Sequence, residues 1–281
     1  MRILRTIEEM KSACRELQRE GRALGYVPTM GALHAGHISL VRASRQNGDA
    51  VAASIFVNPL QFAPNEDFSR YPRTFDDDCR LLQAEGVDLL FAPTAEEMYP
   101  PGACTLVEVA GVGDRLDGGS RPGHMRGIAT VVSKLFHIVR PDRAYFGQKD
   151  AAQVAVLRQM VRDQNFDLQL VVCPIVRDSD GLALSSRNRY LDADQRRQAL
   201  VLWRSLQQVA RLLASGERSA ATLIAAAQAV FATEPDVRVD YIALVDWATL
   251  LPAETALPGS LFAVAAWVGS TRLIDNLIAS E

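Results

Sequence analysis

Short apolar runs alternate with stretches of helical periodicity from the start of the chain to about residue 175. The apolar runs predict five strands, at 24–27, 51–57, 89–91, 144–146 and 168–172. Apolar residues recur at helical spacing between them and predict helices at 38–46, 74–85, 127–139 and 150–163. This alternation is typical of an α/β fold, so we predict a parallel sheet with helices on both faces.

The pattern changes after about residue 190, where Ala, Leu and Gln become frequent. Two long helical stretches, at 193–215 and 220–233, precede two apolar runs that predict strands at 237–245 and 260–268. Helices followed by strands form an α+β module. We therefore predict two domains, a larger one over residues 1–176 and a smaller C-terminal α+β domain over residues 177–281.

Polar clusters follow the predicted strands of the larger domain. In a parallel sheet, ligands bind outside the carboxyl ends of the strands. We therefore expect four segments to converge on one crevice: residues 28–37, 58–62, 147–150 and 177–187.

The first of these segments is a turn with two histidines, His34 and His37, on either side of Gly36. Gly31 and Gly36 allow a phosphate to approach the backbone, and a helix that begins near Gly36 directs its N–H groups at an anion. Both imidazoles can donate hydrogen bonds to the same phosphates. The alternative is a pair of capping or surface histidines. Since two of the four histidines in the chain fall in this turn, we favour the functional interpretation.

Two further segments combine positive charge with groups that can donate hydrogen bonds. Lys149 can neutralise a phosphate, and Asp150 can hold a ribose hydroxyl, cap the next helix or approach a metal shell. The hydroxyls of Ser185 and Ser186 and the guanidinium of Arg187 suit a phosphoryl group in transfer. The alternatives are simple helix caps and solvated charges.

Neutral amides form the remaining candidate set. Asn58, Gln61 and Gln153 can bind the hydroxyls or the carboxylate of a small substrate, although each can also be a surface amide. The basic, glycine-rich segment 121–127 either contacts a ligand or sets a turn before the next helix.

Composition excludes several classes of protein. The 281 residues are 48% hydrophobic and 22% charged, with a formal net charge of −3 and no basic block, so we expect no nucleic-acid partner. Four widely spaced cysteines without a Cys-x-x-Cys pair favour free thiols in a reducing cytoplasm. No signal peptide or membrane-spanning run is predicted. The usual dinucleotide and P-loop motifs are missing, so nucleotide binding must come through the histidine turn.

Taken in order, segments 27–37, 56–62, 146–150 and 185–188 closely resemble the pantoate–β-alanine ligases, a family within the nucleotidyltransferase superfamily with its His-x-Gly-His motif. The resemblance implies a Rossmann-like ATP- and pantoate-binding domain and a C-terminal lid domain. It also implies that ATP and pantoate give pantoyl-adenylate and pyrophosphate, and that β-alanine then displaces AMP to give pantothenate. Mg²⁺ as a cofactor and a homodimer are further implications.

The resemblance also assigns site residues. It places ATP against a set of backbone and side-chain groups: Met30, Gly31, Ala32, Leu33, His34, Ala35, Gly36, His37, Gly147, Gln148, Lys149, Asp150, Val176, Leu184, Ser185, Ser186 and Arg187. Catalytic roles fall to His37 as proton donor and to His34, Lys149, Ser185, Ser186 and Arg187. Pantoate contacts Gln61, Gln153 and Asn58, and no protein side chain is assigned to the metal.

Two positions depart from the family pattern. Leu184 stands where methionine is frequent, and Ala151 and Ala152 stand where bulkier residues are frequent. Leucine for methionine conserves volume and should be tolerated. The two alanines weaken the assignment of a pocket wall near Gln153.

Two other functions remain as alternatives. A nucleotidylyltransferase that acts on a phosphorylated acceptor would need more basic residues and no pair of substrate-binding amides. A non-catalytic nucleotide-binding module would keep Gly31 and Gly36 but would need neither His37 nor Lys149.

Overall fold

The computed structural model describes residues 1–64 and 66–280, and their contacts group the chain into two units. Unit 1 comprises Met1–Gly147 and Val156–Pro174, and unit 2 comprises Gln148–Ala155 and Ile175–Glu281. The division into domains at residue 176 stays a prediction. None of the described helices is both long and apolar enough to cross a lipid bilayer.

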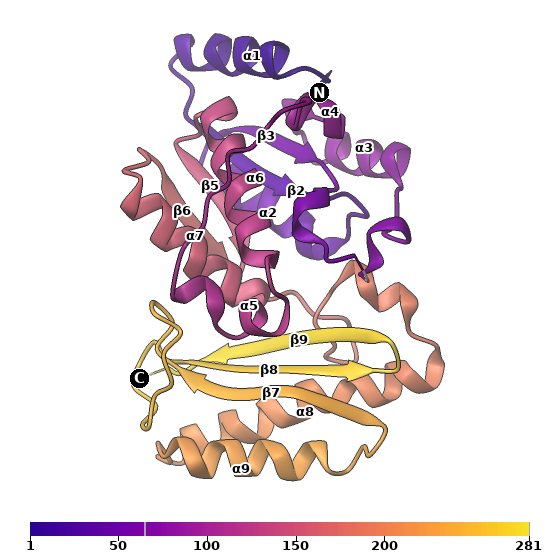
Figure 1. The fold of residues 1–281 in the computed structure, drawn as a ribbon, viewed down its shortest axis with the longest axis vertical. Helices are drawn as coiled ribbons and strands as arrows, with labels where there is room; N and C mark the ends of the chain where they lie inside the picture. The colour runs from indigo at the N-terminus through magenta and orange to yellow at the C-terminus, as the bar shows by residue number, and fades with distance from the viewer. Residues whose placement is uncertain (65, 281) are drawn as a thin grey trace. The chain divides into compact units, whose positions relative to one another are not determined.

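Unit 1 is built on a six-stranded parallel sheet (Figure 1). The strands lie in the order β1-β4-β3-β2-β5-β6, with bounds β1 Arg2–Leu4, β2 Leu24–Thr29, β3 Ala50–Ile55, β4 Leu89–Phe91, β5 Arg143–Gly147 and β6 Gln169–Cys173. The predicted parallel sheet is confirmed, and all five predicted strands are present. β1 was not predicted, because three residues at a sheet edge are too few to show an alternating pattern.

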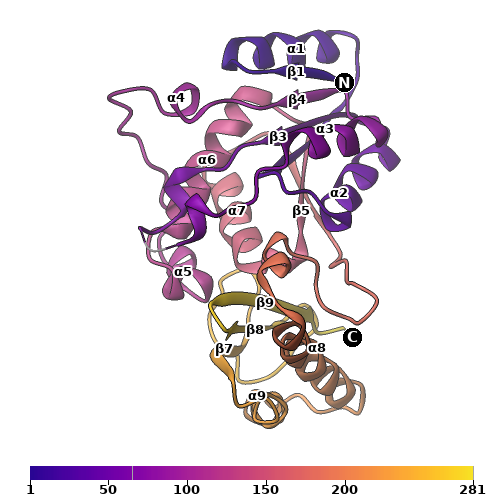
Figure 2. The ribbon, with the colours of Figure 1, turned by 90° about the vertical axis from the view of Figure 1, so that its right-hand side faces the viewer.

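Helices cover both faces of this sheet (Figure 2). On one face α2 (Ala35–Gln46) and α3 (Phe75–Ala84) close a core that includes Val27, Leu40, Val51, Leu82 and Leu90. On the other face lie α6 (His124–Val139) and the unit 1 part of α7 (Ala151–Asp163), and the Phe136 ring of α6 meets Phe146 of β5 at 6.4 Å. The short helices α4 and α5 span Ala95–Met98 and Asp117–Ser120.

The first helix, α1 (Ile7–Arg19), was not predicted, although the sequence carries a signal for it. Thr6 Oγ1 accepts from the Glu9 N–H at 3.2 Å, and Glu9 Oε2 accepts from the Thr6 N–H at 3.0 Å. This reciprocal capping box is a Thr-x-x-Glu pattern that can be found in the sequence alone.

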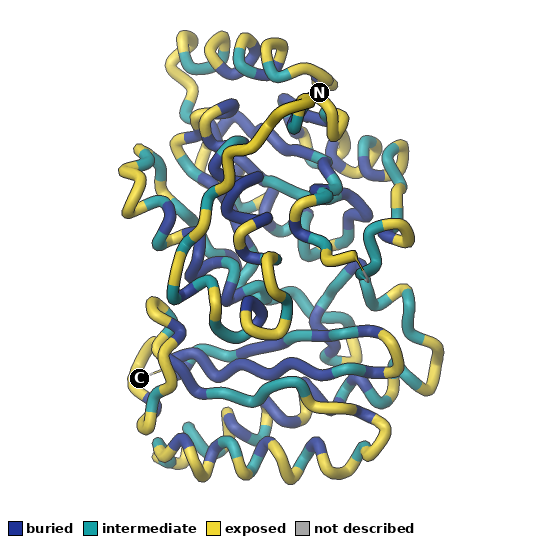
Figure 3. Tube along the Cα trace, in the orientation of Figure 1, coloured by how far each residue is buried: buried dark blue, intermediate teal, exposed yellow. Residues whose placement is uncertain are grey.

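Unit 2 is a three-stranded antiparallel sheet with two helices packed on one face. The strands are β7 (Val237–Val245), β8 (Leu261–Val268) and β9 (Thr271–Ile278), and the helices are α8 (Ala193–Ala214) and α9 (Ala220–Phe231). The central strand β8 is buried along nearly its whole length, as Figure 3 shows. The predicted α+β character is confirmed, but β9 was not predicted because polar residues interrupt its apolar pattern.

The strand order of unit 1 reverses between β2 and β5, which are neighbours in the sheet. From β2 the chain continues to β3 and β4 on one side of the sheet, and from β5 it continues to β6 on the other side. Open α/β sheets bind ligands outside the strand ends at such a switch point. The segments that follow β2 and β5, which begin at Met30 and Gln148, are therefore the first places to look for a site.

Candidate active site

The turn after β2 has a strained backbone. Gly31 has φ +80° and Ala32 has φ +52°, so two consecutive residues occupy the left-handed region. Glycine tolerates this conformation, whereas for alanine it costs about 1 kcal/mol. At Gly31 a Cβ would also lie 3.0 Å from Asp78 Oδ2 and 3.1 Å from Ile55 Cγ2. Backbone conformation and space therefore both favour glycine at residue 31, and the approach of a phosphate to it stays a prediction.

A buried carboxylate holds this strained turn in place. Asp78 of α3 is 2% exposed, and its oxygens accept from the Ala32 N–H at 2.9 Å and from the Leu33 N–H at 2.8 Å. The Thr74 hydroxyl donates to the same carboxylate at 3.2 Å. The sequence analysis did not single out Asp78, whose negative charge we now assign to fixing the turn.

The two histidines use one ring nitrogen each to build the start of α2. His34 is the N-cap, and its Nδ1 accepts from the Gly36 N–H at 3.2 Å. His37 Nδ1 in turn accepts from the His34 N–H at 3.4 Å. An acceptor nitrogen carries no proton in a neutral imidazole, so each ring keeps its proton on Nε2. The helix starts at Ala35, one residue before Gly36.

The rings lie close enough to influence each other. Their centroids are 4.1 Å apart, at an interplanar angle of 40°. Two positive charges at this separation would repel each other. The Nε2–H of each neutral ring can donate a hydrogen bond to an anion.

The loop after β3 presents Gln61 towards the histidine turn. Gln61 Nε2 lies 3.0 Å from the sulfur of Met30, and Gln61 Oε1 accepts from Asn58 Nδ2 at 3.1 Å. Asn58 is 1% exposed and also donates to the Gly127 carbonyl at 3.0 Å. Its Oδ1 accepts from the Leu60 N–H and from the Tyr99 hydroxyl. Asn58 thus lies behind Gln61 and holds its side chain.

Helix α6 holds the same loop from its N-terminal end. A Cβ on Gly127 would meet the Leu60 carbonyl oxygen at 2.2 Å, so only glycine allows this approach. His124 Nδ1 lies 2.8 Å from the Gln61 carbonyl oxygen, and its Nε2 lies 2.5 Å from Arg121. The basic segment 121–127, for which two roles were open, therefore supports the Gln61 loop within unit 1.

Arg121 continues this support to Glu66. The Arg121 guanidinium donates from Nε to Glu66 Oε1 at 2.6 Å and from Nη2 to Glu66 Oε2 at 2.7 Å. Burial by itself would raise the pKa of Glu66, but the hydrogen bonds and charge of Arg121 outweigh it and lower that pKa. Glu66 is therefore charged at neutral pH, and the bidentate pair stabilises the loop.

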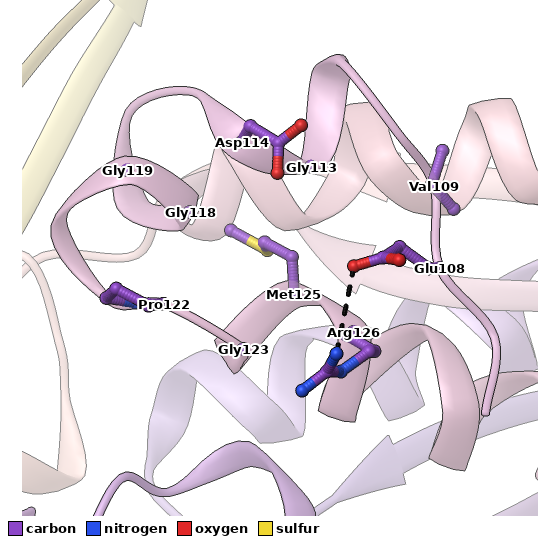
Figure 4. A pocket seen from close by; sticks show the side chains of 10 residues that line it. All are labelled: Glu108, Val109, Gly113, Asp114, Gly118, Gly119, Pro122, Gly123, Met125 and Arg126. Carbon is purple, nitrogen blue, oxygen red and sulfur yellow. Dashed lines mark ion pairs between the residues drawn. The ribbon is translucent and has the colours of Figure 1, made fainter.

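Described residues of unit 1 line cavities that include two of about 300 Å³ each. One is lined by residues that follow three neighbouring strands, Met30 and Gly31 after β2, Phe56 and Val57 after β3, and Ala92 and Pro93 after β4. Figure 4 shows the other, whose lining includes four glycines and an exposed Arg126–Glu108 pair at 4.0 Å. The first cavity lies at the carboxyl edge of the sheet and is the better candidate for a ligand.

Lys149 lies in a short 3₁₀ turn, Gln148–Asp150, at the start of unit 2. Its side chain is 19% exposed, and its ammonium lies 3.6 Å from the half-exposed carboxylate of Asp150. Asn276 of β9 donates to the carbonyl oxygens of Gln148 and Lys149 at 3.0 Å each. Gln153 is half-buried one turn further on, after the buried Ala151 and Ala152.

The segment from Val176 to Arg187 folds back on itself within unit 2. The Leu184 N–H donates to the Val176 carbonyl at 3.0 Å, and Arg177 pairs with Ala183 as an antiparallel bridge. Ser185 then caps the turn Ser186–Tyr190, since its Oγ accepts from the Arg187 N–H at 3.3 Å. The capping alternative is therefore correct for Ser185, which leaves its hydroxyl hydrogen able to donate elsewhere.

Asn188 holds the last part of this segment in place. Its Nδ2 donates to the Ala183 carbonyl at 3.0 Å. Its Oδ1 is buried and meets no hydrogen-bond partner among the residues that the structure describes. A buried acceptor of this kind is costly unless a further group reaches it.

The structure thus gathers the predicted site residues into two groups. Met30 to His37, Asn58 and Gln61 contact one another or the same neighbours in unit 1. In unit 2, the turn Gln148–Asp150 is bonded to β9 and is followed by Gln153, and Val176 and Leu184–Arg187 form the folded segment. Across residues 1–64 and 66–280, no three His, Cys, Asp or Glu side chains are clustered as metal ligands.

Comparison with known proteins identifies the family. The family model named pantoate-beta-alanine ligase matches residues 2–278. The chain belongs to the pantoate-beta-alanine ligase family. This confirms the resemblance inferred from the four sequence segments and covers nearly the whole chain.

Individual members of the family are similar over their full lengths. A pantothenate synthetase from Koribacter versatilis is 61% identical over 99% of this chain and 96% of the relative. One from Thermotoga neapolitana is 53% identical, with 99% of each chain covered. The similarity is therefore not confined to the histidine motif.

Solved structures of pantothenate synthetases and pantoate-beta-alanine ligases are similar to this chain in fold. A pantothenate synthetase from Thermus thermophilus has a TM-score of 0.95 at 46% identity, with all of both chains covered. A Francisella tularensis pantoate-beta-alanine ligase, complexed with beta-gamma ATP and beta-alanine, has a TM-score of 0.76 at 32% identity, with 99% of this chain and 98% of that chain covered. The fold described above is the fold of the ligase family.

Proposed function

We propose that this chain condenses pantoate with β-alanine at the expense of ATP, and that pantothenate, AMP and pyrophosphate are the products. The observation that carries this conclusion is the match to the pantoate-beta-alanine ligase family model over residues 2–278. The Francisella tularensis ligase complexed with beta-gamma ATP and beta-alanine supports ATP as the co-substrate.

The reaction needs two steps because a carboxylate is a poor acyl donor. A carboxylate oxygen of pantoate attacks the α-phosphorus of ATP, and the bond to the bridging oxygen breaks as pyrophosphate leaves. The β-alanine amine then attacks the acyl carbon of pantoyl-adenylate, loses a proton and expels AMP. The protein has to stabilise charge on pyrophosphate in the first step and keep water from the adenylate in between.

His34 and His37 are our candidates for stabilising the leaving pyrophosphate. Each ring carries its proton on Nε2, because Nδ1 accepts from a backbone N–H. We infer that His37 is the proton donor; for this its ring would take up a second proton on Nδ1 and give up the 3.4 Å bond from the His34 N–H. His34 would stay neutral, since the ring centroids lie 4.1 Å apart and two charged rings would repel. ATP would lie along Met30, Gly31, Ala32, Leu33, Ala35 and Gly36 of the same turn.

The unit 2 residues supply the remaining positive charge. Lys149 would neutralise a phosphate as a point charge, and Arg187 would offer a planar set of donors to the transferred phosphoryl group. Ser185 and Ser186 would donate hydroxyl hydrogens. Gln148, Val176 and Leu184, together with Gly147 at the end of β5 in unit 1, would contact ATP mainly through the backbone. We propose that residues 177–281 act as a lid domain that excludes water during the reaction.

Gln61 and Gln153 are the proposed pantoate ligands. Their amides offer both a donor and an acceptor to a hydroxy acid without burying a counter-charge. Asn58 was expected to bind substrate directly, but its side-chain amide is engaged by Gln61, Gly127, Leu60 and Tyr99. We therefore propose that Asn58 contributes to pantoate binding by holding Gln61.

Mg²⁺ is proposed to accompany ATP. It usually keeps several waters and binds substrate phosphates with at most one or two carboxylates, so it does not require a protein cage. The half-exposed carboxylate of Asp150, in the same turn as Lys149, is suited to hold its water shell. When bound, Mg²⁺ would neutralise part of the charge on the triphosphate.

Two broader properties are also proposals. The homodimer is the state that the family resemblance implies, and sedimentation equilibrium would test it. A cytoplasmic location is supported by the four cysteines, which are all free in the structure.

The test of the proposed function is product analysis with purified protein, ATP, Mg²⁺, pantoate and β-alanine. We expect equal amounts of pantothenate, AMP and pyrophosphate. A nucleotidylyltransferase would release pyrophosphate only with a phosphorylated acceptor, and a non-catalytic module would bind ATP without releasing pyrophosphate. Either result would contradict the proposal.

A further inference from the structure

Strand β9 carries two consecutive buried polar residues, Asp275 and Asn276, each 3% exposed. Consecutive strand residues point to opposite faces of a sheet. Leu273 and Leu277, which alternate with Asp275, pack in the core with α8 and α9. Asp275 therefore lies on the helix-covered face and Asn276 on the other face.

Asn276 is bonded to the turn that carries Lys149. Its Nδ2 donates to the Gln148 and Lys149 carbonyls at 3.0 Å each, and its Oδ1 accepts from Gln148 Nε2 at 3.1 Å. Trp247 Nε1 donates to the next carbonyl but one, Ala151, at 3.1 Å. The Asn276 side chain thus forms three hydrogen bonds to one short turn.

Asp275 is bonded to the segment that carries Arg187. Arg177 donates to its two carboxylate oxygens at 2.6 and 2.9 Å, and also to the Gly181 carbonyl at 3.1 Å. The guanidinium lies 3.8 Å from the centroid of the Trp203 ring. Burial raises the pKa of Asp275, so the charged carboxylate depends on the Arg177 pair.

We propose that Asp275 and Asn276 are positioning residues for the adenylation step, through which one strand fixes both the Lys149 turn and the start of the segment that ends at Arg187. This inference rests on the proposed function. Neither residue touches substrate in this account. Asn276 fixes the position of the backbone that carries Lys149. Asp275 fixes the position of the Arg177 side chain, and Arg177 forms the β-bridge to Ala183.

The expected loss of rate follows from how far a catalytic group would be displaced. Misplacement of a catalytic group by about 1 Å can lower a rate by about 100-fold. A purely structural role would lower stability and leave the kinetic constants of the folded enzyme unchanged. A positioning role would instead affect ATP and its phosphates most, since Lys149 and Arg187 are the proposed phosphate-binding groups. Of the two proposed pantoate ligands, Gln61 lies in unit 1, and Gln153 lies in α7, beyond the turn that Asn276 holds.

The experiment uses the full chain with two near-isosteric substitutions, Asn276→Asp and Asp275→Asn. Asn276→Asp removes the two donated hydrogen bonds, and Asp275→Asn removes the charge that pairs with Arg177. We expect kcat for pyrophosphate release to fall by about tenfold or more and KM for ATP to rise, with KM for pantoate within about twofold of wild type. Asn276→Ala serves if the aspartate variant does not fold.

The matched control is Asp240→Asn. Asp240 of β7 accepts from Arg272 of β9 at 2.7 and 2.9 Å, so it belongs to a similar carboxylate–guanidinium pair in the same sheet, and that pair includes neither the Lys149 turn nor Arg177. We expect its kinetic constants to match those of wild type. Folded variants at 275 and 276 with wild-type kinetics would overturn the proposal. Failure of the wild type itself to release pyrophosphate would instead overturn the proposed function.

Discussion

At the scale of single residues, the histidine turn assigns separate tasks to the two nitrogens of each ring. Nδ1 of His34 and Nδ1 of His37 hold the backbone at the start of α2, and Nε2 keeps the proton. Replacement of His37 by alanine removes the donor but leaves the N-cap of α2, which is His34. The helix should therefore still form.

We expect His37→Ala to lower kcat for pyrophosphate release by about 100-fold or more, with little change in the free energy of unfolding. Rapid measurement of pyrophosphate under saturating ATP and pantoate checks this. His137→Ala is the control, because His137 is an exposed histidine that lies far along the chain from the turn, with its ring tilted against Phe166. Equal activity of the two variants would show that His37 is not the proton donor.

Asn58 gives a second prediction at this scale. Asn58→Ala would leave the Gly127 carbonyl, the Tyr99 hydroxyl and Gln61 without their buried partner. We expect a loss of about 3 kcal/mol in the free energy of unfolding and a higher KM for pantoate. Urea unfolding and steady-state kinetics measure the two effects. A raised KM for ATP alone would contradict the role assigned to Asn58.

At the scale of elements, α3 stabilises the strained turn that precedes α2. Asp78→Asn keeps the size of the side chain but replaces one acceptor of the two turn N–H groups by an NH₂ group. We expect a loss of about 2 kcal/mol in the free energy of unfolding and a higher KM for ATP. Asp76→Asn, at an exposed position of the same helix, should change neither. If both variants behave alike, Asp78 does not hold the turn.

The periodic elements could be predicted from the sequence because their burial pattern is local. β2 to β6 and helices α2, α3, α6 and α7 each carry an apolar pattern that their own residues reveal. β9 could not be predicted in this way, since Asp275 and Asn276 interrupt its apolar run. Their burial becomes favourable only through bonds to residues nearly 100 or more positions away.

The residues of the candidate site also fall into those with a local sequence signal and those without one. His34, His37, Lys149 and Arg187 are proposed from the sequence because their chemistry is evident in short motifs, and their roles stay predictions. Asp78 was not singled out, because its contacts with Ala32 and Leu33 span more than 40 residues. Supporting residues of this kind depend on tertiary contacts, and one sequence carries no local signal for them.

At the scale of the whole molecule, the four free cysteines differ in burial and so offer a test of the packing of unit 1. Burial raises the pKa of Cys14 to about 12 and also raises the pKa of Cys79 and Cys173. A raised pKa keeps these thiols neutral in the folded protein. The stability that the folded state gains by holding the Cys14 proton is complete below the ordinary thiol pKa of 9.0, and it is lost as the pH rises towards 12.

We therefore expect brief alkylation at pH 8 to label the exposed Cys104 first and to leave Cys14 and Cys173 unlabelled in the native protein. Peptide mass spectrometry identifies the labelled residue, and the same reaction in denaturant, where all four should react, is the control. Early labelling of Cys14 would contradict the packing of α1 described here.

The central claim, a two-step ligase that forms pantoyl-adenylate, is tested most directly by following the carboxylate oxygen of pantoate. The wild-type protein is incubated with pantoate carrying ¹⁸O in its carboxylate, ATP, Mg²⁺ and β-alanine, and the AMP is analysed by mass spectrometry. Attack of the carboxylate on the α-phosphorus predicts one ¹⁸O in each AMP and one ¹⁸O retained in pantothenate. AMP without ¹⁸O, formed together with pantothenate, would contradict the adenylate mechanism.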